Sequence, residues 1–274
     1  MKTLTAFILC FACISTYAQQ HQMEKIWETD SVMRVPESVL YDSGKDVLYV
    51  AMMDGQPGAA DGKGGIAKLS PTGKIIDLNW ISGLNAPKGM AIHGGKLYAA
   101  DLTEVVVIDL NTNKIDRRIA VDSAKFLNDV TVDAKGVLYV SDSRTSKIHR
   151  IANNTVSDYL VDVKGVNGLR AIKNDLFILA GGSLLKADQQ KKMVTIATGM
   201  EKSTDGIEPT LDGNYIVSCW SGNVYYVFAN GKTELMLDTR EQKINAADIG
   251  FNPAKNIIYV PTFFKNSVAA YQLK

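Results

Sequence analysis

The stretch that decides the fold is FLNDVTVDAKGVLYVSDS, from Phe126 to Ser143. It contains two runs in which apolar and polar residues alternate, VTVD and VLYVSD, joined by turn residues at 134–136. Such an arrangement predicts a β-hairpin. The pair Asn128-Asp129 stands directly before the first predicted strand, so two oxygen-bearing side chains lie where that strand begins. The importance of this pair depends on whether the pattern recurs.

The pattern does recur, because six strands similar to VLYVSD occur along the chain. They are VLYVAM from Val47, KLYAAD from Lys96, VLYVSD from Val137, DLFILA from Asp175, NYIVSC from Asn214 and IIYVPT from Ile257. Equivalent positions in these strands are separated by 49, 41, 38, 38 and 44 residues. Repeats of about 40 to 50 residues that contain several strands each are typical of propeller blades.

Each repeat shows the same order of predicted strands. An opening strand follows a small polar motif, and the VLYVSD-like strand comes second. A third strand follows, as in EVVVIDL, and then a fourth, as in KIDRRIAV. The sixth repeat lacks a fourth strand, whereas EKIWETDS at residues 24–31 precedes the first repeat. Pairing these ends would remove an open sheet edge. We therefore predict an all-β, six-bladed β-propeller with four-stranded blades, closed by an N-terminal strand that joins the last blade.

The first residues are predicted to form a signal peptide. Lys2 supplies a basic start, residues 4–14 are almost entirely apolar, and Thr16-Tyr17-Ala18 ends in a small residue before Gln19. A membrane-spanning helix needs about 20 apolar residues, and neither this segment nor any later one is long enough. We expect cleavage after Ala18, export to the periplasm or out of the cell, and a single propeller domain over residues 19–274. A lipid-modified Cys13 is the alternative.

Composition excludes some classes of partner. Without residues 1–18, 29 basic residues face 29 acidic ones, and no run of five like charges occurs. The chain therefore offers no basic stripe for nucleic acid. Cys219 is the only cysteine beyond the signal peptide, so it has no internal disulfide partner. We expect it to be a buried, inert thiol.

The inner strand of each propeller blade lines the central channel and begins near one mouth. The pairs that open these strands are Glu37-Ser38, Lys88-Gly89, Asn128-Asp129, Asn167-Gly168, Asp205-Gly206 and Ala247-Asp248. Four of the first positions carry oxygen donors: Glu37, Asn128, Asn167 and Asp205. Calcium takes about six to eight oxygen ligands, including carboxylates and amide carbonyls. Because no His or Cys joins the set, zinc is disfavoured, and we predict a divalent metal site with Ca²⁺ as the preferred ion.

Several of these residues have other interpretations. Asn-Gly, Asp-Gly and Asn-Asp are common turn formers, and turns occur at strand starts. Glu37 is a poor turn residue, so its presence with the other three favours a site. Lys88 would bind an anionic substrate group, pair with Asp129 or Asp248, or lie solvated at the channel rim. Trp220 would pack between blades or form part of a pocket wall.

These residues resemble the SMP-30/gluconolactonase/LRE-like family of calcium-dependent six-bladed propellers. The resemblance covers the repeat architecture of the whole mature chain, with Glu37 and the short motifs FLNDV, GVNGL and STDGI as its specific matches. It implies one metal ion held by Glu37, Asn128, Asn167 and Asp205, and it implies Asp205 as the group that activates water. Two departures concern the substrate. Ser-Val-Leu follows Glu37 where the family usually has Gly-Pro and an aromatic residue, and Phe126-Leu127 stand where sugar lactonases often have Arg.

Two functions are compatible with this pattern. The first is an exported, calcium-dependent hydrolase of a small-molecule lactone or related ester, whose metal would polarise the carbonyl oxygen as a Lewis acid. Its catalytic candidates are Asp205, Asp129 as a second candidate for activating water, and Lys88 for orienting the substrate. The alternative is a non-enzymatic exported propeller that binds a small ligand or a protein partner, with the metal absent or structural. An open metal position at an accessible mouth would favour the enzyme.

Overall fold

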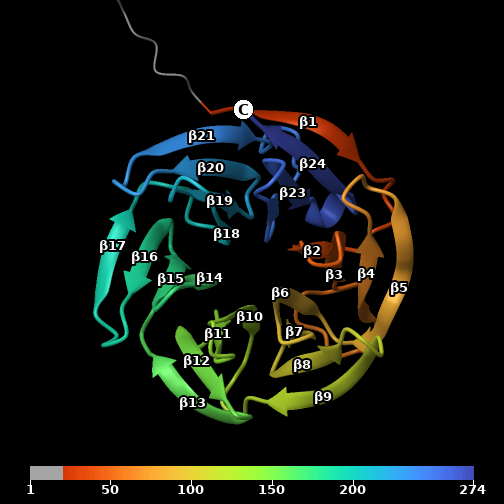
Figure 1. The fold of residues 1–274 in the computed structure, drawn as a ribbon, viewed down its shortest axis with the longest axis vertical. Helices are drawn as coiled ribbons and strands as arrows, with labels where there is room; N and C mark the ends of the chain where they lie inside the picture. The colour runs from red at the N-terminus through yellow and green to blue at the C-terminus, as the bar shows by residue number, and fades with distance from the viewer. Residues whose placement is uncertain (1–20) are drawn as a thin grey trace, which may run out of the picture.

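A computed structural model describes residues 21–274, which form six antiparallel four-stranded sheets arranged in a ring (Figure 1). The predicted six-bladed, all-β propeller is therefore confirmed. The signal peptide predicted at residues 1–18 lies outside the described residues. Within the described range, no helix is long and apolar enough to cross a membrane.

Each blade contains four strands, counted from the axis outward. The inner strands are β2 (Pro36–Asp42), β6 (Pro87–His93), β10 (Leu127–Val132), β14 (Val166–Ile172), β18 (Thr204–Pro209) and β22 (Gly250–Asn252). The second strands are β3 (Val47–Met52), β7 (Lys96–Asp101), β11 (Leu138–Asp142), β15 (Asp175–Ala180), β19 (Tyr215–Cys219) and β23 (Ile257–Pro261).

The outer half of each blade follows the same order. The third strands are β4 (Gly64–Leu69), β8 (Glu104–Asp109), β12 (Lys147–Ala152), β16 (Ser183–Ala187), β20 (Asn223–Val227) and β24 (Val268–Leu273). The outermost strands are β5 (Ile75–Leu84), β9 (Lys114–Ala120), β13 (Thr155–Leu160), β17 (Met193–Ala197), β21 (Thr233–Asp238) and β1 (Met23–Glu28). The described residues contain one short 3-10 helix, η1 (Phe263–Lys265).

The ring closes through strands from the two ends of the described chain. β1 pairs with β24, with Met23 opposite Leu273 and Glu28 opposite Ala269. In Figure 1 the red β1 accordingly lies beside the dark blue β24. The sheet order β1-β24-β23-β22 confirms that an N-terminal strand completes the last blade.

The hydrophobic core lies between neighbouring blades. Along β3, Leu48, Val50 and Met52 pack in the cluster shared with the last blade. Tyr49 and Ala51 pack in the cluster shared with the second blade. Because successive side chains of a strand point to opposite faces, a strand buried on both faces reads as the continuous apolar run VLYVAM.

The strand order defines two faces of the ring. We call the face at which the inner strands begin the upper face, and the opposite one the lower face. Since the chain reverses at each turn, the loops that follow the second strands also lie on the upper face, and the turns between inner and second strands lie on the lower face.

Candidate metal and active site at the upper mouth of the channel

Five sequence-predicted residues occupy the same position in their strands. The second residues of β2, β6, β10, β14 and β18 are Glu37, Lys88, Asn128, Asn167 and Asp205. At this place each of these strands carries one residue more than the strand it pairs with. In β10, for example, the step of three residues from Leu127 to Val130 lies opposite the step of two residues from Asp142 to Val140. A β-bulge of this kind redirects the side chain that it carries. The bulges therefore take these five side chains out of the regular alternation.

Three glycines behind these residues allow the inner strands to approach one another. A Cβ at Gly168 would lie 1.9 Å from the carbonyl oxygen of Asp205, and one at Gly89 would lie 2.0 Å from Oδ1 of Asp129. A Cβ at Gly206 would meet the next blade at 2.5 Å. None of the three has a positive φ. The Asn-Gly and Asp-Gly pairs are thus sites of close backbone approach, and their interpretation as turn formers is wrong.

Glu37, Asn167 and Asp205 lie at this mouth, and Asn167 and Asp205 are joined by a hydrogen bond. Glu37 and Asp205 are 5% and 3% exposed, and Nδ2 of Asn167 donates a hydrogen bond to Oδ1 of Asp205 at 2.9 Å. Burial raises the pKa of Glu37 well above its usual value; the Asp205 carboxylate raises it further, and the Lys88 ammonium opposes this rise. Burial also raises the pKa of Asp205, to which the Asp248 carboxylate adds.

The oxygen atoms at this mouth fit a hard cation. Oε2 of Glu37 and Oδ1 of Asn167 are buried, and no group in residues 21–274 donates a hydrogen bond to them. Nδ2 of Asn128 donates to Oγ of Ser143 at 3.2 Å, so both Asn side chains use their nitrogen elsewhere and keep their oxygen available. A buried acceptor without a donor costs about 1–3 kcal/mol. A divalent cation such as Ca²⁺ takes carboxylate and amide oxygens of this kind.

Lys88 lies within the same group and is almost inaccessible, with 1% of its surface exposed. Its ammonium donates a hydrogen bond to the carbonyl oxygen of Ala86 at 2.8 Å and lies 4.4 Å from the centre of the Phe126 ring. Burial lowers the pKa of Lys88, while the carboxylates of Glu37 and Asp101 oppose this effect. The interpretation of Lys88 as a solvated rim residue is therefore wrong.

Asp129 lies below the candidate ligands and connects two blades. Its Oδ1 accepts a hydrogen bond from the backbone N–H of Val130 at 2.6 Å, and its Oδ2 accepts one from Leu169 of the next blade at 2.6 Å. Burial raises the pKa of Asp129 well above its usual value, and repulsion from Asp248 adds to this. Both carboxyl oxygens therefore hold backbone groups in place.

Asp248 faces Asp129 from the last blade, and the sequence had identified it only as a partner for Lys88. Its Oδ2 accepts a hydrogen bond from the Ser38 hydroxyl at 2.5 Å. Asp248 keeps some exposure to the channel, yet protein surrounds it, and this burial raises its pKa to about 6 despite the Ser38 hydrogen bond. Its place in the pair Ala247-Asp248 was the sequence signal for this position.

The channel below is narrow and acidic. A cavity of about 20 Å³ is lined by residues that include Ser38, Asp129, Arg170, Glu208 and Asp248. This volume holds about one water molecule and is too small for a substrate.

Two aspartates that sequence reasoning missed hold the loops in front of the inner strands. Asp142, at the end of β11, accepts hydrogen bonds from the backbone N–H groups of Lys125 and Phe126 at 2.8 and 3.2 Å. Asp101, at the end of β7, accepts them from Asn85 and Ala86. The available signal was the Asp that ends both KLYAAD and VLYVSD.

Other metal and thiol chemistry finds little support here. Within residues 21–274, no three His, Cys, Asp or Glu side chains are grouped to hold a metal ion. The predicted set has only two carboxylates, Glu37 and Asp205, and its other two members are amides. The finding on His, Cys, Asp and Glu therefore does not test this set, and the metal site stays a prediction. Cys219 is fully buried, as expected, and burial raises the pKa of its thiol to about 12.

Comparison with known proteins identifies relatives of the fold. No protein-family model and no curated protein sequence matches the chain. A solved structure of a candidate gluconolactonase has a TM-score of 0.69 at 14% identity, over 93% of this chain and 92% of that one. A virginiamycin B lyase from Staphylococcus aureus, solved as a catalytically inactive His→Ala variant with quinupristin, has a TM-score of 0.64 at 12% identity, over 93% and 99%.

A third solved structure is a Bacteroides thetaiotaomicron protein of unknown function. It has a TM-score of 0.69 at 11% identity, over 93% of this chain and 76% of that one. At these identities the similarity establishes the fold alone. That fold matches the gluconolactonase-type propeller that the sequence resembles.

Proposed function

We propose that the chain is a metal-dependent hydrolase that acts on a lactone or related ester at the upper mouth of its channel. The observation that carries the proposal is a pair of buried oxygen atoms, Oε2 of Glu37 and Oδ1 of Asn167, that lie beside Asp205 and receive no hydrogen bond from residues 21–274. With Asn128 they form an oxygen-only set suited to Ca²⁺. When bound there, the ion would supply Lewis-acid polarisation of a substrate carbonyl.

The residues of the site have different parts in this proposal. Asp205 is the acidic group that accepts a proton from water, since its Oδ2 has no hydrogen-bond donor within the described residues, whereas both oxygens of Asp129 hold backbone groups. Lys88 places a buried positive charge beside Glu37 and would orient an electron-rich substrate oxygen. Asn167 holds the Asp205 carboxylate through its amide nitrogen.

Lyase chemistry like that of the Staphylococcus aureus neighbour has less support. That protein was inactivated by replacing a His, so its activity depends on a His residue. The three His residues of this chain lie away from the candidate ligands. His21 stacks on Tyr226 at the outside of the fifth blade, His149 is buried in β12, and His93 ends β6 at the lower face.

A second function is favoured by one specific observation, the near-complete burial of Glu37 and Asp205. A site this enclosed also suits a structural ion, and the propeller would then be a non-enzymatic binding protein with a small-molecule or protein partner. Metal binding without hydrolysis would support this alternative. Both proposals include export directed by residues 1–18. The mass of the exported protein tests this, because it shows whether these residues have been removed.

The test is calcium titration of the purified mature chain by calorimetry, followed by hydrolysis assays on a panel of lactones and esters. We expect one calcium site in the wild type, and Asp205→Asn should weaken binding by at least about 100-fold and abolish turnover, because one ligand charge is removed. Asp122→Asn, an exposed residue in an upper-face loop, is the matched control and should behave as wild type. Retained turnover in Asp205→Asn would refute the assignment of this residue.

A further inference from the structure

Three aromatic side chains gather on the upper face where the fifth and sixth blades meet. Trp220 follows β19, and Phe263 and Phe264 belong to η1 after β23. The Trp220 ring lies edge-to-face with Phe263 at 5.5 Å and with Phe264 at 6.3 Å between centroids. Trp220 is 39% exposed and Phe264 is 61% exposed. We call these three residues the aromatic patch.

The aromatic patch is continuous with the candidate active site. Phe263 is buried and packs in one apolar cluster with Ala247, the residue before Asp248. The helix η1 contacts β2, the strand that carries Glu37. The same cluster is lined by Phe126, whose ring lies against the Lys88 ammonium. An apolar layer therefore extends from the patch to the surroundings of the ligands.

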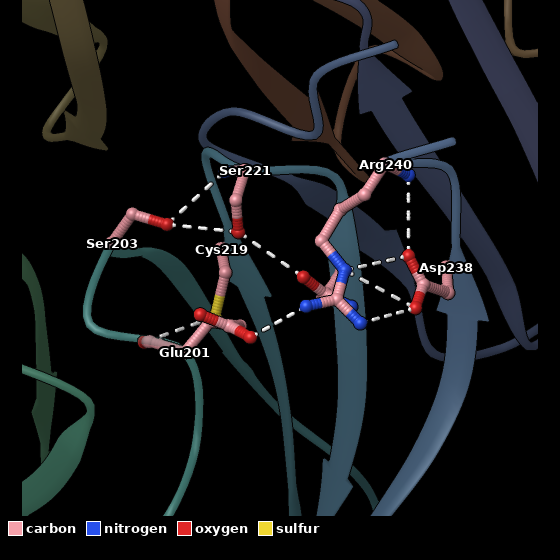
Figure 2. A network of polar contacts seen from close by, with 7 residues as sticks. Glu201, Ser203, Cys219, Ser221, Asp238 and Arg240 are labelled. Atoms are coloured by element: carbon pink, nitrogen blue, oxygen red, sulfur yellow. Dashed lines mark hydrogen bonds and ion pairs between the residues drawn. The ribbon is translucent and has the colours of Figure 1, made fainter. Parts of the chain in front are cut away.

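Hydrogen bonds fix the turn that carries Trp220 (Figure 2). The backbone N–H of Trp220 donates to the carbonyl oxygen of Ser203 at 2.8 Å. Figure 2 shows that the residues on either side are also held: Ser221 contacts Oγ of Ser203 at 3.0 and 3.1 Å, and the Cys219 thiol donates to the carbonyl oxygen of Glu201 at 3.6 Å.

A second set of contacts braces this turn against the loop after β21. The Arg240 guanidinium pairs with Glu201 and Asp238, each at 2.6 Å (Figure 2). Nδ2 of Asn245 donates to the carbonyl oxygen of Trp220 at 2.8 Å. Trp220 is therefore an exposed aromatic residue on a braced backbone.

Phe263 has a left-handed backbone conformation, as does Asp54 at the corresponding turn of the first blade. The φ of Phe263 is +52°, in the left-handed region that bulky residues rarely adopt, and such a conformation costs about 1–3 kcal/mol. Here the strained residue supports Trp220 edge-on and contacts the layer that leads to the candidate ligands.

We propose that the aromatic patch binds an apolar, preferably aromatic, substituent of the substrate, so that the substrate class is an aryl- or alkyl-substituted lactone or ester. This inference rests on the proposed function and defines its substrate. Rigid aromatic side chains bury large apolar areas and lose little conformational entropy on binding. A polyhydroxylated sugar lactone would instead lose hydrogen bonds to water against these rings.

The test compares two lactones that differ only in a phenyl group, γ-phenyl-γ-butyrolactone and γ-butyrolactone, on the calcium-loaded mature chain. We expect kcat/KM to be at least about tenfold higher for the phenyl compound. Trp220→Ala should reduce this ratio to near one, Trp220→Phe should keep most of it, and Phe264→Ala should give a partial loss. Leu211→Ala removes an 81% exposed apolar side chain on the lower face and should leave the ratio unchanged. A ratio that Trp220→Ala does not alter overturns the inference.

Binding of a lactam that resists hydrolysis, 5-phenyl-2-pyrrolidinone, separates this inference from the proposed function. If the wild type binds the lactam, Trp220→Ala weakens this binding at least tenfold, and neither lactone is hydrolysed, the result supports the aromatic patch and contradicts the hydrolase. Equal hydrolysis of both lactones, with equal binding of 5-phenyl-2-pyrrolidinone and 2-pyrrolidinone, overturns the patch and leaves the hydrolase. Absence of lactam binding by the wild type overturns the patch in either case.

Discussion

Gly168 lies where the inner strand of the fourth blade approaches that of the fifth. Any Cβ there would lie 1.9 Å from the carbonyl oxygen of Asp205, which is closer than two non-bonded atoms can come. The neighbouring residue, Asn167, and Asp205 are two of the proposed ligands. Gly168 therefore sets the spacing between them.

At this residue scale, we predict that Gly168→Ala lowers the free energy of unfolding by about 2–3 kcal/mol, because the backbone must shift to relieve the contact. The same shift should weaken calcium binding by at least about tenfold. Urea unfolding and calorimetric titration measure the two effects. Gly58→Ala is the control, since its Cβ would make an ordinary 3.5 Å contact with Arg144. Wild-type stability and calcium affinity in Gly168→Ala would contradict the prediction.

The sequence identified which residues share a position in the inner strands, but it did not predict which other side chains surround them. Glu37, Asn128 and Asp205 were predicted to share one place in the inner strands of the first, third and fifth blades, and the structure puts them there. The burial of Lys88 was not predictable in this way, because the ring that covers it belongs to Phe126 of another blade. The presence of a metal ion stays a prediction.

At the scale of elements, the second strands were the easiest to predict and the outer strands the hardest to bound. KLYAAD coincides with β7 because the side chains of its central residues, 97–100, pack against blades on both sides, which demands apolar residues in the middle of the strand. The outer strand β1 ends at Glu28, three residues before the end of the predicted segment EKIWETDS at residues 24–31. Outer strands are exposed on much of their surface, so their sequence constrains their ends less.

Arg170 on β14 and Glu208 on β18 join the inner strands of two blades. Nη1 of Arg170 donates to Oε1 of Glu208 at 3.2 Å, and Nη2 lies 3.0 Å from Oε2. Burial raises the pKa of Glu208 to about 7, although Arg170 opposes the rise. A folded pKa above the unfolded value of 4.5 means that the folded chain binds this proton more tightly. Its contribution is therefore present at low pH and is lost as pH rises from about 4.5 through 7.

We predict that Arg170→Gln destabilises the fold by about 2–3 kcal/mol at pH 8 and by much less at pH 5, because removal of the cation leaves a buried carboxylate without its partner. Urea unfolding at the two pH values measures the difference. The double variant Arg170→Gln with Glu208→Gln should recover most of the loss at pH 8. An equal loss at both pH values would show that Arg170 acts through packing and not through charge.

At the scale of the whole molecule, the pairing of β1 with β24 closes the ring, and Glu28 at the end of β1 adds side-chain contacts to it. Oε1 of Glu28 accepts a hydrogen bond from the Ser267 hydroxyl at 2.6 Å and lies 2.6 Å from the Lys265 ammonium. Burial would raise the pKa of Glu28, but the hydrogen bonds from Lys265, Ser267 and Lys25 outweigh this and lower it to about 2. The resulting stabilisation is present above the unfolded value of 4.5 and is lost as pH falls through about 2.

We predict that Glu28→Gln lowers the free energy of unfolding by about 1–2 kcal/mol at pH 7, which allows for solvent screening of a partly exposed group. The difference from wild type should shrink as pH falls from 4.5 towards 2, as followed by guanidinium unfolding at several pH values. Glu24→Gln is the control, because Glu24 lies on the same strand as Glu28 and its exposed side chain pairs with Lys274; it should cost under about 0.5 kcal/mol. A loss that does not vary with pH would argue against the ion pair.

The sequence by itself determined the number of blades, the order of strands within each blade and the closure of the ring. These properties depend on period-two alternation, turn residues and one missing strand, all of which are encoded within single repeats. Only the tertiary structure decided that Asp129 binds the backbone of Leu169, and that Trp220 meets Phe263 from the next blade. The physical reason is that the channel and the upper face are assembled from segments about 40 residues apart. Which side chains meet there depends on how the closed ring brings neighbouring blades together.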